Sequence, residues 1–238
     1  MKALGKLFAI SMLMAGCAGN HGGEIDSLIR IGQKARLSGN PEVALKCYTK
    51  ALTLDSDNTT ALLGMAEAYI DLKILDAASE YIKKAVEKGG DSAKASYLRG
   101  KINLLAGEEE LAEKEFLKWT SVDTQNALGA IYDGRGEHER AQNLYKQVIV
   151  KDPNYIDAYN NMGLSLMLCN KYDEAIFYLE NACALPNATV ANRSNLALCY
   201  GLSGNMAKAR TIYAQDFAEA ALEEKMAYIE DITSPKSS

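Results

Sequence analysis

The chain is poor in the residues on which metal, disulfide and nucleophile chemistry depend. Its 238 residues include two histidines, His21 and His138, one tryptophan and five cysteines. The histidines belong to no cluster with metal-ligand spacing, so no metal site is predicted. The sequence also has no Gly-x-Ser-x-Gly elbow, no phosphate-cradling Gly-Lys-Ser loop and no dinucleotide fingerprint. We therefore predict that the protein is not an enzyme and uses no metal or cofactor.

The chain also has no excess of positive charge and no long hydrophobic run. Lysine and arginine number 26 against 31 aspartates and glutamates, which gives a formal net charge of −5. An acidic chain without a basic stripe is a poor partner for nucleic acid or for anionic lipid headgroups. The uncharged apolar segment from Leu7 to Ala15 is too short to span a bilayer as a helix. We expect protein partners.

The N-terminal apolar segment has the form of a secretory leader. It follows a short basic region and ends in Leu13-Met14-Ala15-Gly16-Cys17. This ending resembles a bacterial lipobox, with Met14 where leucine is commoner. The resemblance implies that residues 1–16 are removed and that Cys17 is acylated on its sulfur and then on its new amino group. The alternative is an ordinary cleaved leader in which Cys17 is incidental.

Lipidation would fix the location of the protein. Three acyl chains exceed what stable anchoring needs, so the resemblance implies a mature protein that stays on the membrane. Ala18, and not aspartate, follows the cysteine. By the sorting rule of such lipoproteins this implies the outer membrane, with the chain facing the periplasm. Residues 17–23 are expected to form a flexible tether.

The dominant feature of the remaining chain is a repeat. A small residue, an alanine twelve residues later and a bulky residue four further on recur six times, and each series steps by 34, 34, 29, 34 and 34. The small residues are Gly32, Ala66, Gly100, Gly129, Gly163 and Ala197; the alanines are Ala44, Ala78, Ala112, Ala141, Ala175 and Ala209; the bulky residues are Tyr48, Ile82, Phe116, Tyr145, Leu179 and Tyr213. Small residues let antiparallel helices approach closely, and a residue four positions on lies on the same helix face. The spacing predicts six helix–turn–helix units.

A helical pair with this period and these small contacts is similar to the tetratricopeptide repeat. The pattern is fullest in the fifth unit, from Tyr159 to Pro186. The resemblance covers residues 24–217 and implies an all-α tetratricopeptide-repeat superhelix of about six units, with an extended binding surface. An ordinary helical bundle is the alternative. Residues 218–233 carry an apolar stripe and are expected to form a capping helix, and residues 234–238 a disordered tail.

The third unit is five residues shorter than the others, and Trp119 stands near its end. An oversized residue beside a shortened turn suggests that Trp119 plugs the space left there. A ligand anchor is the alternative.

Beside Cys17, four cysteines remain: Cys47, Cys169, Cys183 and Cys199. Cys183 and Cys199 fall on the second helix of one unit and the first helix of the next, so an oxidising compartment would allow a bridge between them. Free buried thiols are the expectation, because cysteine is often simply buried.

The C-terminal part resembles one particular family. Residues 193–204 read Arg-Ser-Asn-Leu-Ala-Leu-Cys-Tyr-Gly-Leu-Ser-Gly, and residues 226–229 read Met-Ala-Tyr-Ile. An Arg-x-Asn-Leu-Ala-Leu helix, a Gly-Leu-x-Gly turn and a final Ala-Tyr helix resemble the end of TadD, the tetratricopeptide lipoprotein of tight-adherence (Flp) pilus systems. Met226 stands where that family often has asparagine.

The resemblance implies a pilotin-like assembly factor that binds the outer-membrane secretin or other pilus-assembly proteins. The alternative is a periplasmic scaffold lipoprotein that organises cell-wall enzymes or outer-membrane-protein assembly.

The first helices of tetratricopeptide pairs line the concave face of the array. Here those positions are mixed in character in the first three units and mostly apolar in the last two. We predict that this groove binds an apolar or amphipathic segment. The candidate contact residues are Leu63, Tyr97, Leu105, Asn160, Leu164, Met167, Leu168, Leu198 and Leu202. For each leucine the alternative is burial between neighbouring repeats.

Overall fold

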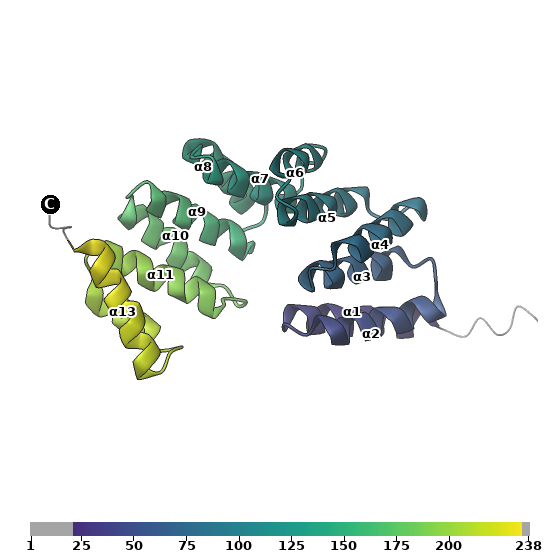
Figure 1. Cartoon of the computed structure of the whole chain (residues 1–238), viewed down its shortest axis with the longest axis horizontal. Coiled ribbons are helices and arrows are strands. Elements are labelled where there is room, and N and C mark those ends of the chain that lie inside the picture. The colour runs from purple at the N-terminus through teal and green to yellow at the C-terminus, as the bar shows by residue number, and fades with distance from the viewer. Residues whose placement is uncertain (1–20, 235–238) are drawn as a thin grey trace, which may run out of the picture. The chain divides into compact units, whose positions relative to one another are not determined.

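The computed structural model describes residues 21–234, and every element in that range is an α-helix, as predicted (Figure 1). The helices are α1 (His21–Leu37), α2 (Pro41–Leu54), α3 (Thr59–Asp71), α4 (Leu75–Glu87), α5 (Ser92–Leu105), α6 (Glu109–Phe116), α7 (Val122–Gly134), α8 (His138–Lys151), α9 (Ile156–Leu168), α10 (Tyr172–Ala184), α11 (Val190–Leu202), α12 (Met206–Tyr213) and α13 (Glu219–Thr233). The leader, Cys17 and residues 235–238 of the expected tail lie outside this range. Within it, no helix is both long enough and apolar enough to cross a membrane.

The chain divides into two compact units at Lys118 and Trp119. Unit one holds the pairs α1/α2, α3/α4 and α5/α6, and unit two holds α7/α8, α9/α10 and α11/α12 together with α13. Within each unit, neighbouring pairs pack against each other, and their first helices also touch. The division falls at the shortened third repeat, where α6 has only 8 residues.

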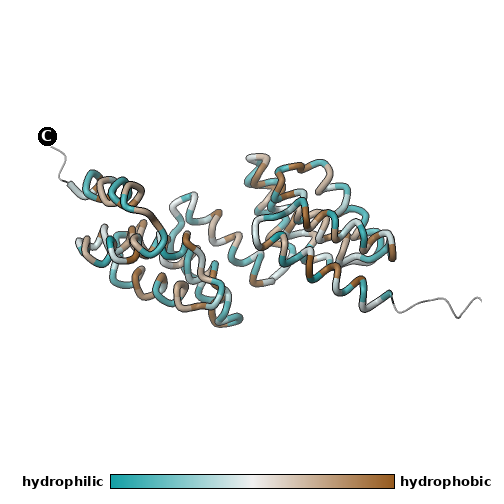
Figure 2. The backbone as a smooth tube through the Cα atoms, turned by 90° about the horizontal axis from the view of Figure 1, so that it is seen from below, coloured by the Kyte–Doolittle hydropathy of each residue, from teal (hydrophilic) through white to brown (hydrophobic). Residues whose placement is uncertain are grey.

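The three periodic series form the contacts that hold each pair together. All eighteen residues are buried. A Cβ added to Gly32 or Gly100 would lie closer than 3.0 Å to the ring of Tyr48 or Phe116, so the bulky side chain fills the space that the glycine leaves open. The result is a close approach of helices with apolar side chains on the inner face of each, and Figure 2 shows brown apolar residues recurring along the helices of both units.

A fourth periodic series lies at the turn inside each pair. At these turns the residues with a left-handed backbone are Gly39, Lys73, Gly107, Gly136, Asn170 and Gly204; Gly89, which also has a positive φ, lies between two pairs. They are spaced like the three buried series, because each follows the first helix of its pair at the same repeat position. Four of the six are glycine, which adopts positive φ without strain.

At its N-terminal end the helical region begins earlier than the expected boundary, whereas at its C-terminal end α13 lies where a capping helix was expected. Helix α1 begins at His21, so Gly22 and Gly23 form its first turn and do not belong to the tether. At the other end, α13 buries Leu222 and Ile229, and Ile229 occupies the space above Gly201 of α11.

Trp119 does not plug the shortened turn. Its side chain is 42% exposed. The turn is held instead by hydrogen bonds, since the Thr124 hydroxyl donates to the Trp119 carbonyl oxygen at 2.6 Å. Ser121 and Thr124 also form a reciprocal cap at the start of α7. Polar capping closes the turn, so no bulky filler is needed.

The four cysteines in the described range are free thiols. Cys199 is fully buried, and burial raises the pKa of its thiol to about 11. Burial also raises the pKa of Cys183. Of the four expected buried thiols, only Cys199 lies in the core, and Cys47, Cys169 and Cys183 are half-buried.

Candidate functional site

A chain of asparagine side chains crosses the first helices of unit two. The side-chain amide of Asn161 in α9 donates to Asn126 in α7 at 3.2 Å. Next to it, the Asn160 oxygen accepts hydrogen bonds from Asn195 at 2.8 Å and from Asn192 at 3.3 Å, both in α11. We call these five residues the asparagine ladder. It links three successive first helices through side-chain amides alone.

Apolar side chains continue the same surface along α9 and α11. Leu164 lies one turn after Asn160 and is half-buried, and Leu168 lies one further turn on and is 62% exposed. The predicted residues Met167, Leu198 and Leu202 are also half-buried. The structure therefore leaves these five predicted side chains accessible, and Leu168 is the one most open to a partner.

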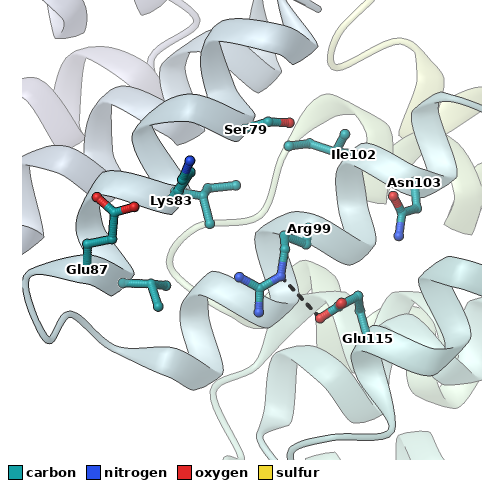
Figure 3. Close-up of a pocket in the computed structure, with 9 residues that line it drawn as sticks. Ser79, Lys83, Glu87, Arg99, Ile102, Asn103 and Glu115 are labelled. Atoms are coloured by element: carbon teal, nitrogen blue, oxygen red, sulfur yellow. Dashed lines mark hydrogen bonds and ion pairs between the residues drawn. The ribbon is translucent and has the colours of Figure 1, made fainter.

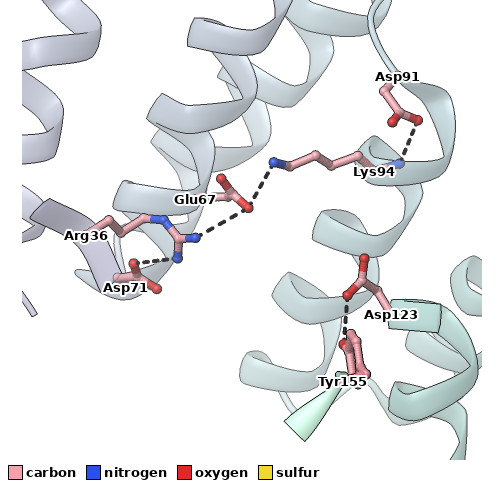
Figure 4. Close-up of polar contacts among 7 residues, drawn as sticks. All are labelled: Arg36, Glu67, Asp71, Asp91, Lys94, Asp123 and Tyr155. Carbon is pink, nitrogen blue, oxygen red and sulfur yellow. Dashed lines mark hydrogen bonds and ion pairs between the residues drawn. The ribbon is translucent and has the colours of Figure 1, made fainter. Parts of the chain in front are cut away.

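The corresponding surface of unit one is ionic. Glu67 in α3 pairs with Arg36 of α1 at 3.7 Å and with Lys94 of α5 at 3.2 Å, and Arg36 also pairs with Asp71 at 3.1 Å (Figure 4). The Glu67 carboxyl side chain is only 14% exposed. These pairs neutralise one another across three first helices, so they leave little free charge for a ligand.

Three predicted contact residues belong to unit one, and their side chains differ in how far they are exposed. Leu63 is 3% exposed and lies in the core, so its assignment to the groove was wrong. It is covered because its side chain packs between neighbouring pairs. Tyr97 is half-buried, with its ring 5.9 Å from that of Phe116. Leu105 is 50% exposed at the end of α5.

Buried polar contacts fix the first helices of unit two in place. Asp133 near the end of α7 accepts hydrogen bonds from Tyr145 at 2.9 Å and Ser165 at 2.7 Å, and it contacts His138 at 2.8 Å. Burial, followed by the Asp133 charge, raises the pKa of Tyr145 well above its ordinary value. Tyr155 similarly donates to Asp123 at 2.7 Å, as the close-up shows (Figure 4). These carboxylates tie α7, α8 and α9 together and play a structural role.

Sequence reasoning had named only one member of the asparagine ladder. A signal for three others was present, because Asn126 and Asn160 are one period apart and so are Asn161 and Asn195, whereas Asn192 has no such counterpart. Among residues 21–234, no three histidine, cysteine or acidic side chains come together to hold a metal ion. On this surface of unit two the accessible groups are amides and apolar side chains, which suits binding.

Comparisons with known proteins agree with this description. Models of the tetratricopeptide repeat match residues 35–102, 126–154 and 144–177. The chain is a tetratricopeptide-repeat protein, and this scaffold is typical of proteins that bind other proteins.

Several solved structures share its fold. PilW, a widely conserved type IV pilus biogenesis factor, is 18% identical with a TM-score of 0.63, over 86% of this chain and 97% of PilW. PilF of Pseudomonas aeruginosa is 16% identical with a TM-score of 0.61, over 87% of this chain and 99% of PilF. Identities this low establish the fold alone.

The curated relatives are much longer proteins. The Hsp70-Hsp90 organizing protein of Triticum aestivum is 28% identical over 180 residues, which are 69% of this chain. The match spans only 30% of the wheat protein, so it supports the assignment of tetratricopeptide repeats and nothing more.

Proposed function

We propose that the protein is a non-enzymatic lipoprotein of the outer membrane that binds pilus-assembly components. The favoured partner is the secretin of a Flp pilus, for which the chain would act as a pilotin-like assembly factor. Three observations support the proposal: the lipobox-like ending at Cys17, the TadD-like C-terminal residues, and the fold shared with PilW, a type IV pilus biogenesis factor.

The asparagine ladder with its apolar continuation carries the proposal. An amide side chain can donate two hydrogen bonds and accept others, as a peptide backbone does. The Asn160 oxygen is used inside the ladder, whereas the Asn195 oxygen and the Asn126 nitrogen keep their capacity. A partner segment could pair its backbone with these groups and place apolar side chains against Leu164 and Leu168. Such a surface holds a peptide without any chemical step.

The binding surface is tested by Leu168→Glu, with Leu37→Glu as the matched control. Both residues end a first helix at the same repeat position, and Leu37 in unit one is 78% exposed. Because neither is core, both variants should fold with nearly unchanged melting temperature. Loss of one buried leucine contact removes about 1.5–3 kcal/mol. Leu168→Glu should therefore weaken secretin binding at least about tenfold, measured with the detergent-solubilised proteins.

Two results would contradict the binding proposal. Normal secretin assembly and surface piliation with Leu168→Glu would place the contact elsewhere. An equal loss with Leu37→Glu would show that the effect is not local to unit two.

Anchoring is tested separately by Cys17→Ser. The Cys17 sulfur is the proposed acyl acceptor, so the variant should incorporate no labelled palmitate and should leave the membrane fraction. Continued palmitate labelling would overturn the anchoring proposal and would leave the binding proposal untouched.

A further inference from the structure

A cavity opens in unit one where α4 meets α5 and α6. Its volume is about 440 Å³, which is within the range of small ligand sites. Ile82 and Val86 of α4 and Ile102 of α5 supply apolar walls. Figure 3 shows Lys83 and Glu87 on the α4 side, with Arg99, Asn103 and Glu115 on the opposite side.

The cavity exists because this junction lacks the large side chains that fill the preceding one. Shifting the numbering back by one period places Leu45, Tyr69 and Tyr81 at the positions of Ser79, Asn103 and Glu115. Those three large residues pack against the core between α2, α3 and α4, and the two tyrosine rings stack at 5.6 Å.

Unit two follows the filled pattern as well. Leu166 and Tyr200 occupy the position of Asn103 there, and both are buried. At the position of Arg99 the other five repeats carry Ile31, Met65, Leu128, Met162 and Leu196. The α4/α5 junction therefore replaces apolar filling with polar and charged side chains around an open space.

Four charged side chains line the cavity: Lys83 and Arg99 are cationic, and Glu87 and Glu115 are acidic. Glu115 accepts from the Ser96 hydroxyl at 2.7 Å, from Lys118 at 2.6 Å and from the Arg99 Nε at 3.3 Å, so its charge is already compensated. The terminal nitrogens of Arg99 make only one long contact, 3.5 Å from Nη2 to Ser96. Lys83 is exposed on the facing wall. A ligand carboxylate entering here would find donors on both sides of an apolar space.

We propose that this cavity binds an aromatic side chain of a partner protein, followed in the partner sequence by an acidic residue. The ring occupies the space between α4, α5 and α6. This space is equivalent to the one that Tyr69 and Tyr81 fill at the preceding junction. The carboxylate of the next residue pairs with Lys83 and with the terminal nitrogens of Arg99. This site lies in unit one and is independent of the asparagine ladder, so it does not rest on the proposed function.

The test uses the full-length protein in detergent and a fluorescent heptapeptide with the sequence Gly-Ser-Gly-Phe-Glu-Gly-Ser. Binding is followed by fluorescence anisotropy. Replacing phenylalanine by alanine in the peptide should weaken binding at least about tenfold, because the ring supplies the buried apolar surface. Replacing glutamate by lysine should also weaken it.

Two protein variants examine the two halves of the proposal. Asn103→Tyr restores the residue of the preceding junction, fills the cavity and should abolish binding without lowering the melting temperature. Lys83→Glu reverses an exposed charge and should weaken binding about 3- to 10-fold. Lys146→Glu is its matched control, because Lys146 is an exposed residue at the same repeat position of α8. That control should bind as the parent protein does.

Several results would overturn the inference. Absence of peptide binding up to about millimolar concentration would do so, since that is the weakest useful affinity for such a contact. Equal loss with Lys146→Glu would show non-specific charge attraction. Preference for a fatty acid over the peptide would assign the cavity to an acyl chain. If Asn103→Tyr fails to fold, Ser79→Leu fills the same space from α4, and unchanged peptide binding by that variant would contradict the proposal.

Discussion

The tightest packing contact suggested by the sequence can be tested at Gly100. This residue of α5 faces the Phe116 ring of α6, and a Cβ there would lie closer than 3.0 Å to three ring atoms. Phe116 is fully buried. We predict that Gly100→Ala destabilises unit one, although alanine is normally the better helix former.

The size of the effect follows from two opposing terms. Inserting one methyl group into a packed core costs about 1–3 kcal/mol. Removing glycine from a helix interior returns about 0.5–1 kcal/mol. The net loss should therefore lie between about 0 and 2.5 kcal/mol, and its middle value of about 1 kcal/mol corresponds to a fall of several degrees in the melting temperature of unit one.

The assay is urea unfolding followed by circular dichroism, with two matched variants. Gly134→Ala places alanine at the end of α7, where an added Cβ meets nothing within 4 Å, so it should stabilise slightly. Gly100→Ala combined with Phe116→Ile recreates the Ala66 and Ile82 pair of the preceding repeat and should recover most of the loss.

Two outcomes would refute the packing argument. A stabilisation by Gly100→Ala equal to that of Gly134→Ala would mean that helix propensity alone decides the result. Failure of the double variant to recover stability would mean that the pair does not act as a unit.

Two further predictions concern the C-terminal end of unit two. Removing the chain from Ala218 onward uncovers the face of α11 at Gly201 that Ile229 covers, so the melting temperature should fall and the protein should aggregate; a monomeric product of unchanged stability would contradict this. Arg193 donates two hydrogen bonds to Asp216, at 2.6 Å each, and this holds the pKa of that carboxyl below its ordinary value. The stabilisation is present above the ordinary pKa and is lost as the pH falls through the lowered one, so Asp216→Asn should lower the urea midpoint at about pH 7 and make little difference at about pH 2.

The sequence by itself determined the helices, their pairing and the core contacts. A period of 34 residues, interrupted by one step of 29, placed Gly32 against Tyr48, and likewise Gly100 against Phe116, Gly129 against Tyr145 and Gly163 against Leu179. This succeeded because helix pairing is set by local geometry. Residues one turn apart share a face, and only a small residue allows a close approach. The turn series that includes Lys73 and Asn170 follows the same period, although neither residue is glycine.

Only the tertiary structure decided which of the accessible-looking residues are accessible. Leu63 and Leu168 both read as groove residues, yet Leu63 is 3% exposed and Leu168 is 62% exposed. Exposure depends on how many neighbouring helices cover a side chain, and no single repeat contains that information. The cavity at Asn103 likewise depends on neighbouring helices, since its walls come from three helices that meet only after folding. Local periodicity builds the scaffold, whereas the sum of contacts from neighbouring pairs decides where it is open to a partner.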